Sequence, residues 1–201
     1  MQKILEIGAK AKFYYDVLNT NRRSVCIDCG ANVGKYSNLM ALKGATVYAF
    51  EPNPWAFKKL KDLSSPSVIP LQKCVSTSNQ NSKLYLHSNH HLDKLLHSTG
   101  SSLESEKWNV DVSNYLSCES VDIVHFITLL AKPIDILKID IEGHEVKLLQ
   151  HLVRHPAACA FIKSCYVELH HKKFEKFAAD TDELIAYFKT HSPFPVNFNW
   201  H

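Results

Sequence analysis

The sequence has no apolar run long enough to cross a lipid bilayer. The longest such run lies around residues 126–131, whereas a membrane-spanning helix needs about 20 predominantly apolar residues. The N-terminus also lacks the apolar segment of a signal peptide. We therefore expect a protein without a membrane span, located in the cytoplasm.

Cysteine is not arranged as in a disulfide scaffold or a zinc site. Six cysteines among 201 residues do not suggest a disulfide framework. Cys26 and Cys29 have C-x-x-C spacing, but they lie on a predicted strand and turn, not at a helix start as in redox motifs. No zinc-ligand spacing links Cys74, Cys118, Cys159 and Cys165. A reducing cytosol is the expected environment.

The sequence also has no large excess of basic over acidic residues. Lys and Arg number 23 against 20 Asp and Glu, which gives +3 with neutral His. This excess is too small to indicate nucleic-acid binding, and no basic face with interleaved aromatic residues is evident. We expect no nucleic-acid partner, and the sequence leaves the oligomeric state open.

Glycine is scarce, yet two of the six glycines punctuate one turn. Residues 25–27 read as a short buried strand, and Gly30, Asn32 and Gly34 follow as a G-x-N-x-G turn before a helical run at 35–43. Glycine allows close backbone approach, and the first N–H groups of a helix point toward a bound ligand. We predict that Gly30, Asn32 and Gly34 contact a cofactor.

Two acidic residues indicate the type of ligand. Asp28 ends the first strand, and Glu51 ends a second strand at residues 46–50. An acid at position 28 would repel a pyrophosphate, and the glycine spacing is not that of a dinucleotide turn. A cationic ligand such as S-adenosylmethionine fits better, with Glu51 accepting hydrogen bonds from both ribose hydroxyls.

Three segments resemble the signature blocks of the FkbM family of S-adenosylmethionine-dependent methyltransferases. These are IDCGANVG at 27–34, FEPNP at 50–54 and LKIDIEGHE at 137–145, and the resemblance covers roughly residues 25–170. It implies a Rossmann-like class I methyltransferase fold with S-adenosylmethionine as cofactor. It also implies methyl transfer, most often to a hydroxyl of a sugar or secondary metabolite.

The remaining pattern predicts one α/β domain over residues 1–201, with a mostly parallel sheet flanked by helices. Further strands are expected at 67–75, 83–87, 110–118, 134–139 and 161–169. Helices are expected within a 1–23 extension, at 54–63, at 121–130 with Ser120 as N-cap, after Gly143, and at 182–189. Residues 195–200 are expected to add one antiparallel strand. The chain stops before a complete class I sheet, so we expect an abbreviated C-terminal edge.

Three further positions are predicted to contact the cofactor. Val75 ends the predicted third strand, where the adenine should lie. Residues 87–111 form an irregular stretch whose serines match a serine-rich turn near the cofactor in the FkbM family, which implies contact by Ser101 or Ser102. Tyr36 is placed to reach the methionine carboxylate, although a core aromatic on that helix face fits nearly as well.

Transfer of a methyl group to a hydroxyl requires a group that takes the hydroxyl proton. Asp140, Glu142 and His170 follow two predicted neighbouring strands, and Asp140 is the first choice for the base. Glu145 is an alternative base or a helix cap. The same three residues could bind a divalent ion, but the sequence does not require one, and we expect no metal.

The sequence thus favours a methyltransferase that acts on a hydroxyl of a small molecule or glycan. A non-catalytic cofactor-binding protein and a nucleotide-dependent oxidoreductase remain open. The oxidoreductase would need dinucleotide glycine spacing and would not tolerate Asp28.

Overall fold

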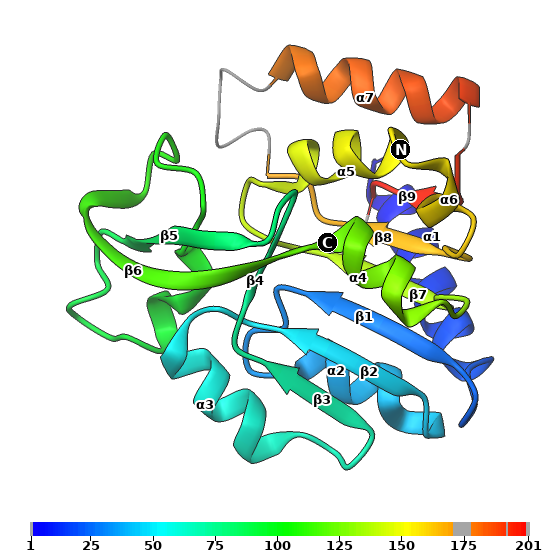
Figure 1. Ribbon diagram of the computed structural model, residues 1–201, viewed down its shortest axis with the longest axis horizontal. Coiled ribbons are helices and arrows are strands. Elements are labelled where there is room, and N and C mark those ends of the chain that lie inside the picture. Colours follow the sequence, from blue (N-terminus) through cyan, green and yellow to red (C-terminus); the bar gives the residue numbers. More distant parts are fainter. Residues whose placement is uncertain (1, 171–177, 192, 200–201) are drawn as a thin grey trace.

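The computed structural model describes residues 2–170, 178–191 and 193–199 and is built on a six-stranded sheet (Figure 1). The strand order is β3-β2-β1-β7-β8-β9, and all neighbouring strands are parallel. The strands are β1 (Val25–Cys29), β2 (Thr46–Phe50), β3 (Val68–Leu71), β7 (Ile136–Ile139), β8 (Cys165–Val167) and β9 (Val196–Asn197). This order confirms the predicted Rossmann-like α/β fold.

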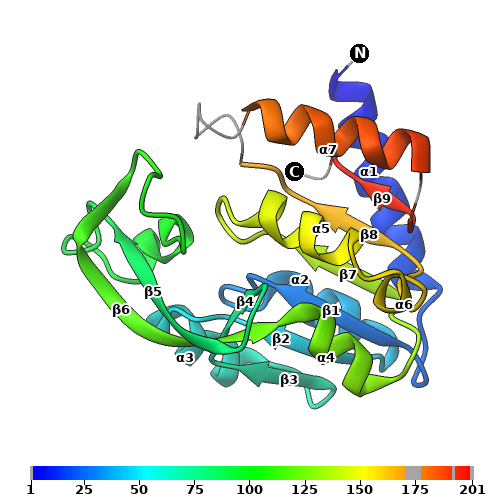
Figure 2. The same ribbon diagram turned by 45° about the horizontal axis from the view of Figure 1, so that its top comes forward.

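Helices cover both faces of this sheet (Figure 2). They are α1 (Gln2–Leu18), α2 (Lys35–Met40), α3 (Pro54–Leu63), α4 (Ile123–Leu130), α5 (Glu145–Val153), α6 (Pro156–Cys159) and α7 (Ala178–His191), with short 3₁₀ helices η1 (Ala41–Lys43) and η2 (Leu96–Gly100). One buried cluster joins the sheet to α4, α5, α6 and α7, and a second joins it to α1, α2 and α3. The sheet is therefore buried from both sides, which explains why its central strands are almost wholly apolar.

Local sequence explains where α3 and α4 begin. The α3 helix begins as predicted: Pro54 occupies its first turn, and the Asn53 side chain accepts hydrogen bonds from Trp55 N and Ala56 N. The predicted N-cap of α4 was wrong. Ser120 pairs within a strand, and Asp122 caps the helix through hydrogen bonds from Val124 N and His125 N.

A second, three-stranded sheet was not predicted. It has the order β4-β6-β5, formed by β4 (Cys74–Ser76), β5 (Gln80–His87) and β6 (Val110–Asp122). The predicted strand at 67–75 divides into β3 and β4, which belong to different sheets. The long β5–β6 pair projects from the body of the molecule (Figure 1).

A disulfide joins Cys74 of β4 to Cys118 of β6. This bond is not evident from the sequence, because the two cysteines are 44 positions apart and only the pairing of β4 with β6 brings them together. Disulfides are typical of oxidising compartments, whereas we expected a reducing cytosol. Cys26 and Cys29 are buried and free, as expected for small core residues.

The C-terminal edge differs from the prediction in direction. Strand β9 pairs with β8 in parallel, not antiparallel, through Cys165–Val196 and Tyr166–Asn197. Trp200, at the end of the predicted strand, lies outside the described residues.

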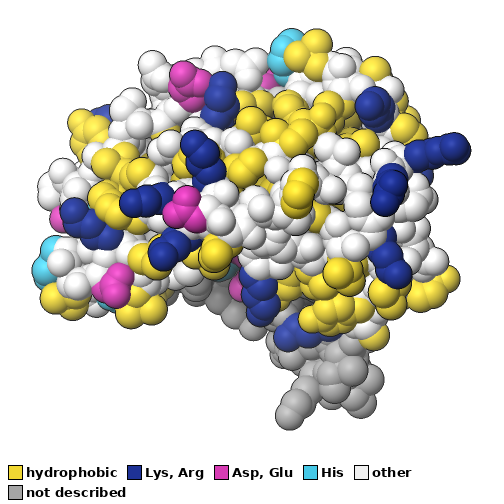
Figure 3. Space-filling view, turned by 90° about the horizontal axis from the view of Figure 1, so that it is seen from below, with side chains coloured by type: hydrophobic (Ala, Val, Ile, Leu, Met, Phe, Trp, Pro, Cys, Tyr) yellow, Lys and Arg dark blue, Asp and Glu magenta, His cyan; other side chains and the backbone are white. Residues whose placement is uncertain are grey.

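Among the described residues, every helix is too short or too polar to cross a lipid bilayer. On the face shown in Figure 3, Lys and Arg side chains are spread among hydrophobic and uncharged groups.

Candidate active site

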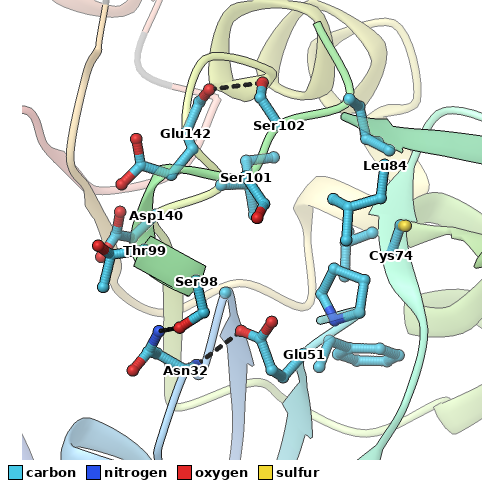
Figure 4. Close-up of a pocket in the computed structure, with 16 residues that line it drawn as sticks. Asn32, Glu51, Cys74, Leu84, Ser98, Thr99, Ser101, Ser102, Asp140 and Glu142 are labelled. Carbon is cyan, nitrogen blue, oxygen red and sulfur yellow. Dashed lines mark hydrogen bonds between the residues drawn. The ribbon is translucent and has the colours of Figure 1, made fainter. Parts of the chain in front are cut away.

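A pocket opens where the central strands end (Figure 4). It encloses about 620 Å³, a volume that includes space open to solvent. Its wall includes eight residues singled out from the sequence: Gly30, Asn32, Glu51, Val75, Ser101, Ser102, Asp140 and Glu142. The signature segments at the ends of β1, β2 and β7 therefore meet at one cavity.

The turn after β1 approaches β7 so closely that only glycine fits. Gly30 has φ +83°, and a Cβ built there would lie 1.8 Å from the carbonyl oxygen of Asp140. Gly34, at φ +89°, begins α2, and a Cβ there would lie 2.7 Å from Leu60 Cδ1. Gly30 lines the pocket, whereas Gly34 fixes the turn behind it.

Glu51 places a buried carboxylate in the pocket wall. Its two oxygens accept hydrogen bonds from Asn32 N and Asn53 N, each at 2.8 Å. Burial raises the pKa of this carboxyl to about 7, although both backbone hydrogen bonds oppose the shift. The carboxylate links the glycine turn to the start of α3.

Asp28 pairs with a buried lysine. Its carboxylate is fully buried, lies 3.1 Å from Lys138 Nζ and accepts a hydrogen bond of 2.6 Å from Ser37 Oγ. Asp28 is not among the residues of the pocket wall. Its contact with a cationic ligand stays a prediction, and the structure adds an ion pair that the sequence did not predict.

Lys138 was missed by the sequence analysis, although it belongs to the third signature segment. Its ammonium group lies between Asp28 at 3.1 Å and Asp140 at 3.4 Å. Burial acts against its charge, but the two carboxylates hold its pKa well above the usual range. The sequence does contain a signal for this role: Lys138 lies inside an otherwise apolar strand, and a buried ammonium group must be paired with an acid.

Tyr36 also lies away from the pocket. Its ring packs edge-on against Phe13 of α1, with centroids 5.8 Å apart, and Lys138 Nζ lies 5.5 Å from its centroid. It is absent from the pocket wall. The alternative interpretation as a packing aromatic on the helix face describes this position.

The serine-rich segment forms the cover of the pocket. Ser98 Oγ accepts a hydrogen bond from Asn32 Nδ2, and Ser101 Oγ accepts one from Asn53 Nδ2. Ser102 Oγ donates to the backbone oxygen of Glu142 over 2.7 Å, as Figure 4 shows. These bonds tie the segment to all three strand ends, which local sequence alone could not indicate.

The candidate proton-accepting groups gather at the edge of the pocket. His170 Nε2 lies 3.6 Å from a Glu142 oxygen and 3.9 Å from an Asp140 oxygen. Burial raises the pKa of Asp140, although Lys138 and His170 oppose the shift. The structure thus brings His170 close to Asp140 and Glu142, which lie on a different segment of the sequence.

Glu145 holds His170 in place. Its buried carboxylate accepts hydrogen bonds from Ile141 N and Gly143 N and lies 2.9 Å from His170 Nδ1. Burial alone would raise the pKa of Glu145, but His170 and the backbone N–H groups lower it. Burial alone would lower the pKa of His170, but Glu145 and the nearby acids raise it. Since a carboxylate only accepts, Nδ1 bears the proton in this pair.

His144 has a different environment from His170. Its Nε2 lies 3.1 Å from Ser76 Oγ, and its Nδ1 lies 2.6 Å from Glu104, which also pairs with Lys147. This buried network fastens the cover of the pocket to the start of α5.

The comparisons with known proteins agree with this geometry. The model of the methyltransferase FkbM domain matches residues 28–192. The chain belongs to the FkbM methyltransferase domain family. Within that FkbM domain lie the glycine turn, Glu51, the serine segment and the His170 cluster.

One curated relative extends the comparison. The chain is 27% identical over 146 residues to the hexuronic acid methyltransferase AglP of Haloferax volcanii, which covers 71% of this chain and 54% of the relative. The chain therefore spans about half the length of that protein. No solved structure gives a significant match.

Proposed function

We propose that the protein is an S-adenosylmethionine-dependent methyltransferase that methylates a hydroxyl group of a small molecule or glycan. The observation that supports this most is the pocket shared by the three signature segments. Its wall combines a close glycine turn, a buried carboxylate at the end of β2 and an acidic cluster with His170 at its edge. Membership of the FkbM family supports the same reaction.

The residues present fit a sulfonium nucleoside. In this proposal, Glu51 accepts hydrogen bonds from the ribose hydroxyls and Val75 makes an apolar contact with the adenine ring. Gly30 has no side chain and so leaves room for the ligand. Asn32, Ser101 and Ser102 supply polar groups around it. The bound cofactor supplies an electrophilic methyl group.

The chain's own contribution to the chemistry lies at the acidic edge. Orienting the acceptor in line with the methyl group supplies most of the rate enhancement, with effective molarities of up to ~10⁵ to 10⁸ M. Asp140 is the proposed acceptor of the hydroxyl proton, and its raised pKa makes it a stronger base than an exposed aspartate. Glu142 and His170 position the acceptor beside it.

The name of the relative supports a sugar derivative as the acceptor class. AglP is named for methylation of a hexuronic acid, a sugar derivative rich in hydroxyl groups. A glycan hydroxyl is therefore the first acceptor to test.

Calorimetry with S-adenosylhomocysteine and with NAD tests the ligand assignment. We expect that S-adenosylhomocysteine binds and NAD does not. Binding of NAD alone would support the oxidoreductase alternative and refute the methyltransferase proposal. Asp140→Asn should then spare S-adenosylhomocysteine binding but lower turnover by roughly 10² to 10⁴-fold in a screen of sugar acceptors with labelled S-adenosylmethionine. Full activity in this variant would exclude Asp140 as the base. Cofactor binding without turnover on any acceptor would favour the non-catalytic alternative.

A further inference from the structure

We propose that Asp140, Glu142 and His170 form a binding site for a divalent cation, with Mn²⁺ or Mg²⁺ as the class of ion. This proposal deepens the proposed function, because the site lies at the edge of the pocket where the acceptor would bind. It replaces our expectation of no metal, which rested on the sequence alone.

The first argument is the spacing of the possible ligand atoms. One nitrogen of His170 and one oxygen from each acid all lie within 4.8 Å of one another. Ligand atoms about 2.1 to 2.4 Å from an ion lie about 3 Å apart when adjacent around it and about 4 to 5 Å apart when opposite. The three atoms therefore need only a small contraction to share one ion.

His170 is buried and presents its Nε2 atom to the site. Its side chain is 5% exposed, and Glu145 fixes its Nδ1 at 2.9 Å. Within the described part of the chain, Nε2 has no acceptor at hydrogen-bond distance; the nearest acidic oxygens lie at 3.6 to 3.9 Å. A metal-bound histidine usually donates its other ring N–H to a carboxylate, and His170 Nδ1 donates to Glu145 in this way.

Acidic groups surround the proposed site. Glu145 and Glu168 lie 2.9 and 3.7 Å from the two ring nitrogens of His170, beside Asp140 and Glu142. Lys138 and Lys107 pair with Asp140 and Glu142 at 3.4 and 2.6 Å. A divalent cation would bind these carboxylates in competition with the two ammonium groups.

The donor set also narrows the ion. Carboxylates favour Mg²⁺, Ca²⁺ and Mn²⁺, while imidazole favours the transition metals, so Mn²⁺ satisfies both donor types. A cation at this edge attracts a hydroxyl oxygen and lowers the pKa of the group it binds. It would thus favour the same deprotonation that the acceptor requires.

The test is a titration of chelator-treated protein with Mn²⁺. Calorimetry and the loss of the free Mn²⁺ signal in electron paramagnetic resonance both measure the binding. We expect one saturable site in the wild type. Asp140→Asn, Glu142→Gln and His170→Gln should each weaken binding by about tenfold or more, since each removes a ligand. Glu119→Gln is the matched control, because Glu119 is an exposed carboxylate paired with Lys73 outside the pocket.

Two outcomes overturn the proposal: no saturable binding up to about 1 mM Mn²⁺, or equal affinity in all three variants and the wild type. Thermal unfolding of each variant shows whether it is folded. Asp140, at 24% the most exposed of the three side chains, gives the variant least prone to misfolding, because Lys138 keeps its ion pair with Asp28. Calorimetry with S-adenosylhomocysteine on the same samples separates the two claims. Cofactor binding without Mn²⁺ binding removes only the metal site, and the reverse result removes only the proposed function.

Discussion

The buried ion pair between Lys138 and Asp28 offers the sharpest test of how this site is held together. Lys138→Met keeps much of the side-chain stem but removes the ammonium group, and it leaves a carboxylate with 0% exposure beside Ser37 alone. Removing one partner of a buried pair costs about 3 to 5 kcal/mol, because the remaining charge stays desolvated. That loss is a large share of the roughly 5 to 15 kcal/mol by which a typical domain is stable.

Urea denaturation measures the effect. With a slope of about 1 to 3 kcal/mol per molar urea, the midpoint should fall by roughly 1 to 5 M. Lys163→Met is the matched control, because Lys163 pairs with Asp135 at 2.8 Å but is 58% exposed. Exposed pairs contribute about 0.2 to 1 kcal/mol, so this variant should unfold almost as the wild type does.

The double variant Asp28→Asn/Lys138→Met separates charge from packing. It removes both charges and keeps a polar group that can bond to Ser37, so it should recover most of the lost stability. The reasoning is refuted if Lys138→Met unfolds within about 1 kcal/mol of the wild type. It is equally refuted if the double variant is no more stable than that single variant.

Three further results are expected. Affinity for S-adenosylhomocysteine should rise as the pH rises to about 7, by up to tenfold per pH unit, because only the ionised Glu51 carboxylate accepts hydrogen bonds from both ribose hydroxyls. Calorimetry on Glu51→Gln should show an affinity that is weaker and does not change with pH. Replacing Cys74 and Cys118 with alanine should lower the free energy of unfolding by about 4 kcal/mol, and alkylation of both thiols in the unreduced wild type would contradict the disulfide. Gly30→Ala should abolish S-adenosylhomocysteine binding through backbone collision, whereas Gly8→Ala, at an exposed helical position with open space, should leave binding unchanged.

The strand-turn-helix at 25–43, the α3 helix and the buried strand before Asp140 were all predictable, because each is set by local pattern. Apolar runs specify buried strands, and Asn53 with Pro54 specifies a helix start within four residues. The signature segments also placed Glu51, Asp140 and Glu142 correctly at strand ends, since parallel strands deliver their carboxyl ends to one edge.

The partners of these residues were decided only by the tertiary structure. Asp28 was expected to face a ligand, but register across β1 and β7 sets it opposite Lys138. The second sheet, with its disulfide between Cys74 and Cys118, likewise depends on pairing between strands far apart in sequence. Local sequence determines which residues form each element and end it. Contacts between elements determine which charged side chains pair with each other. Those contacts depend on sheet register and on burial, and a local sequence pattern specifies neither.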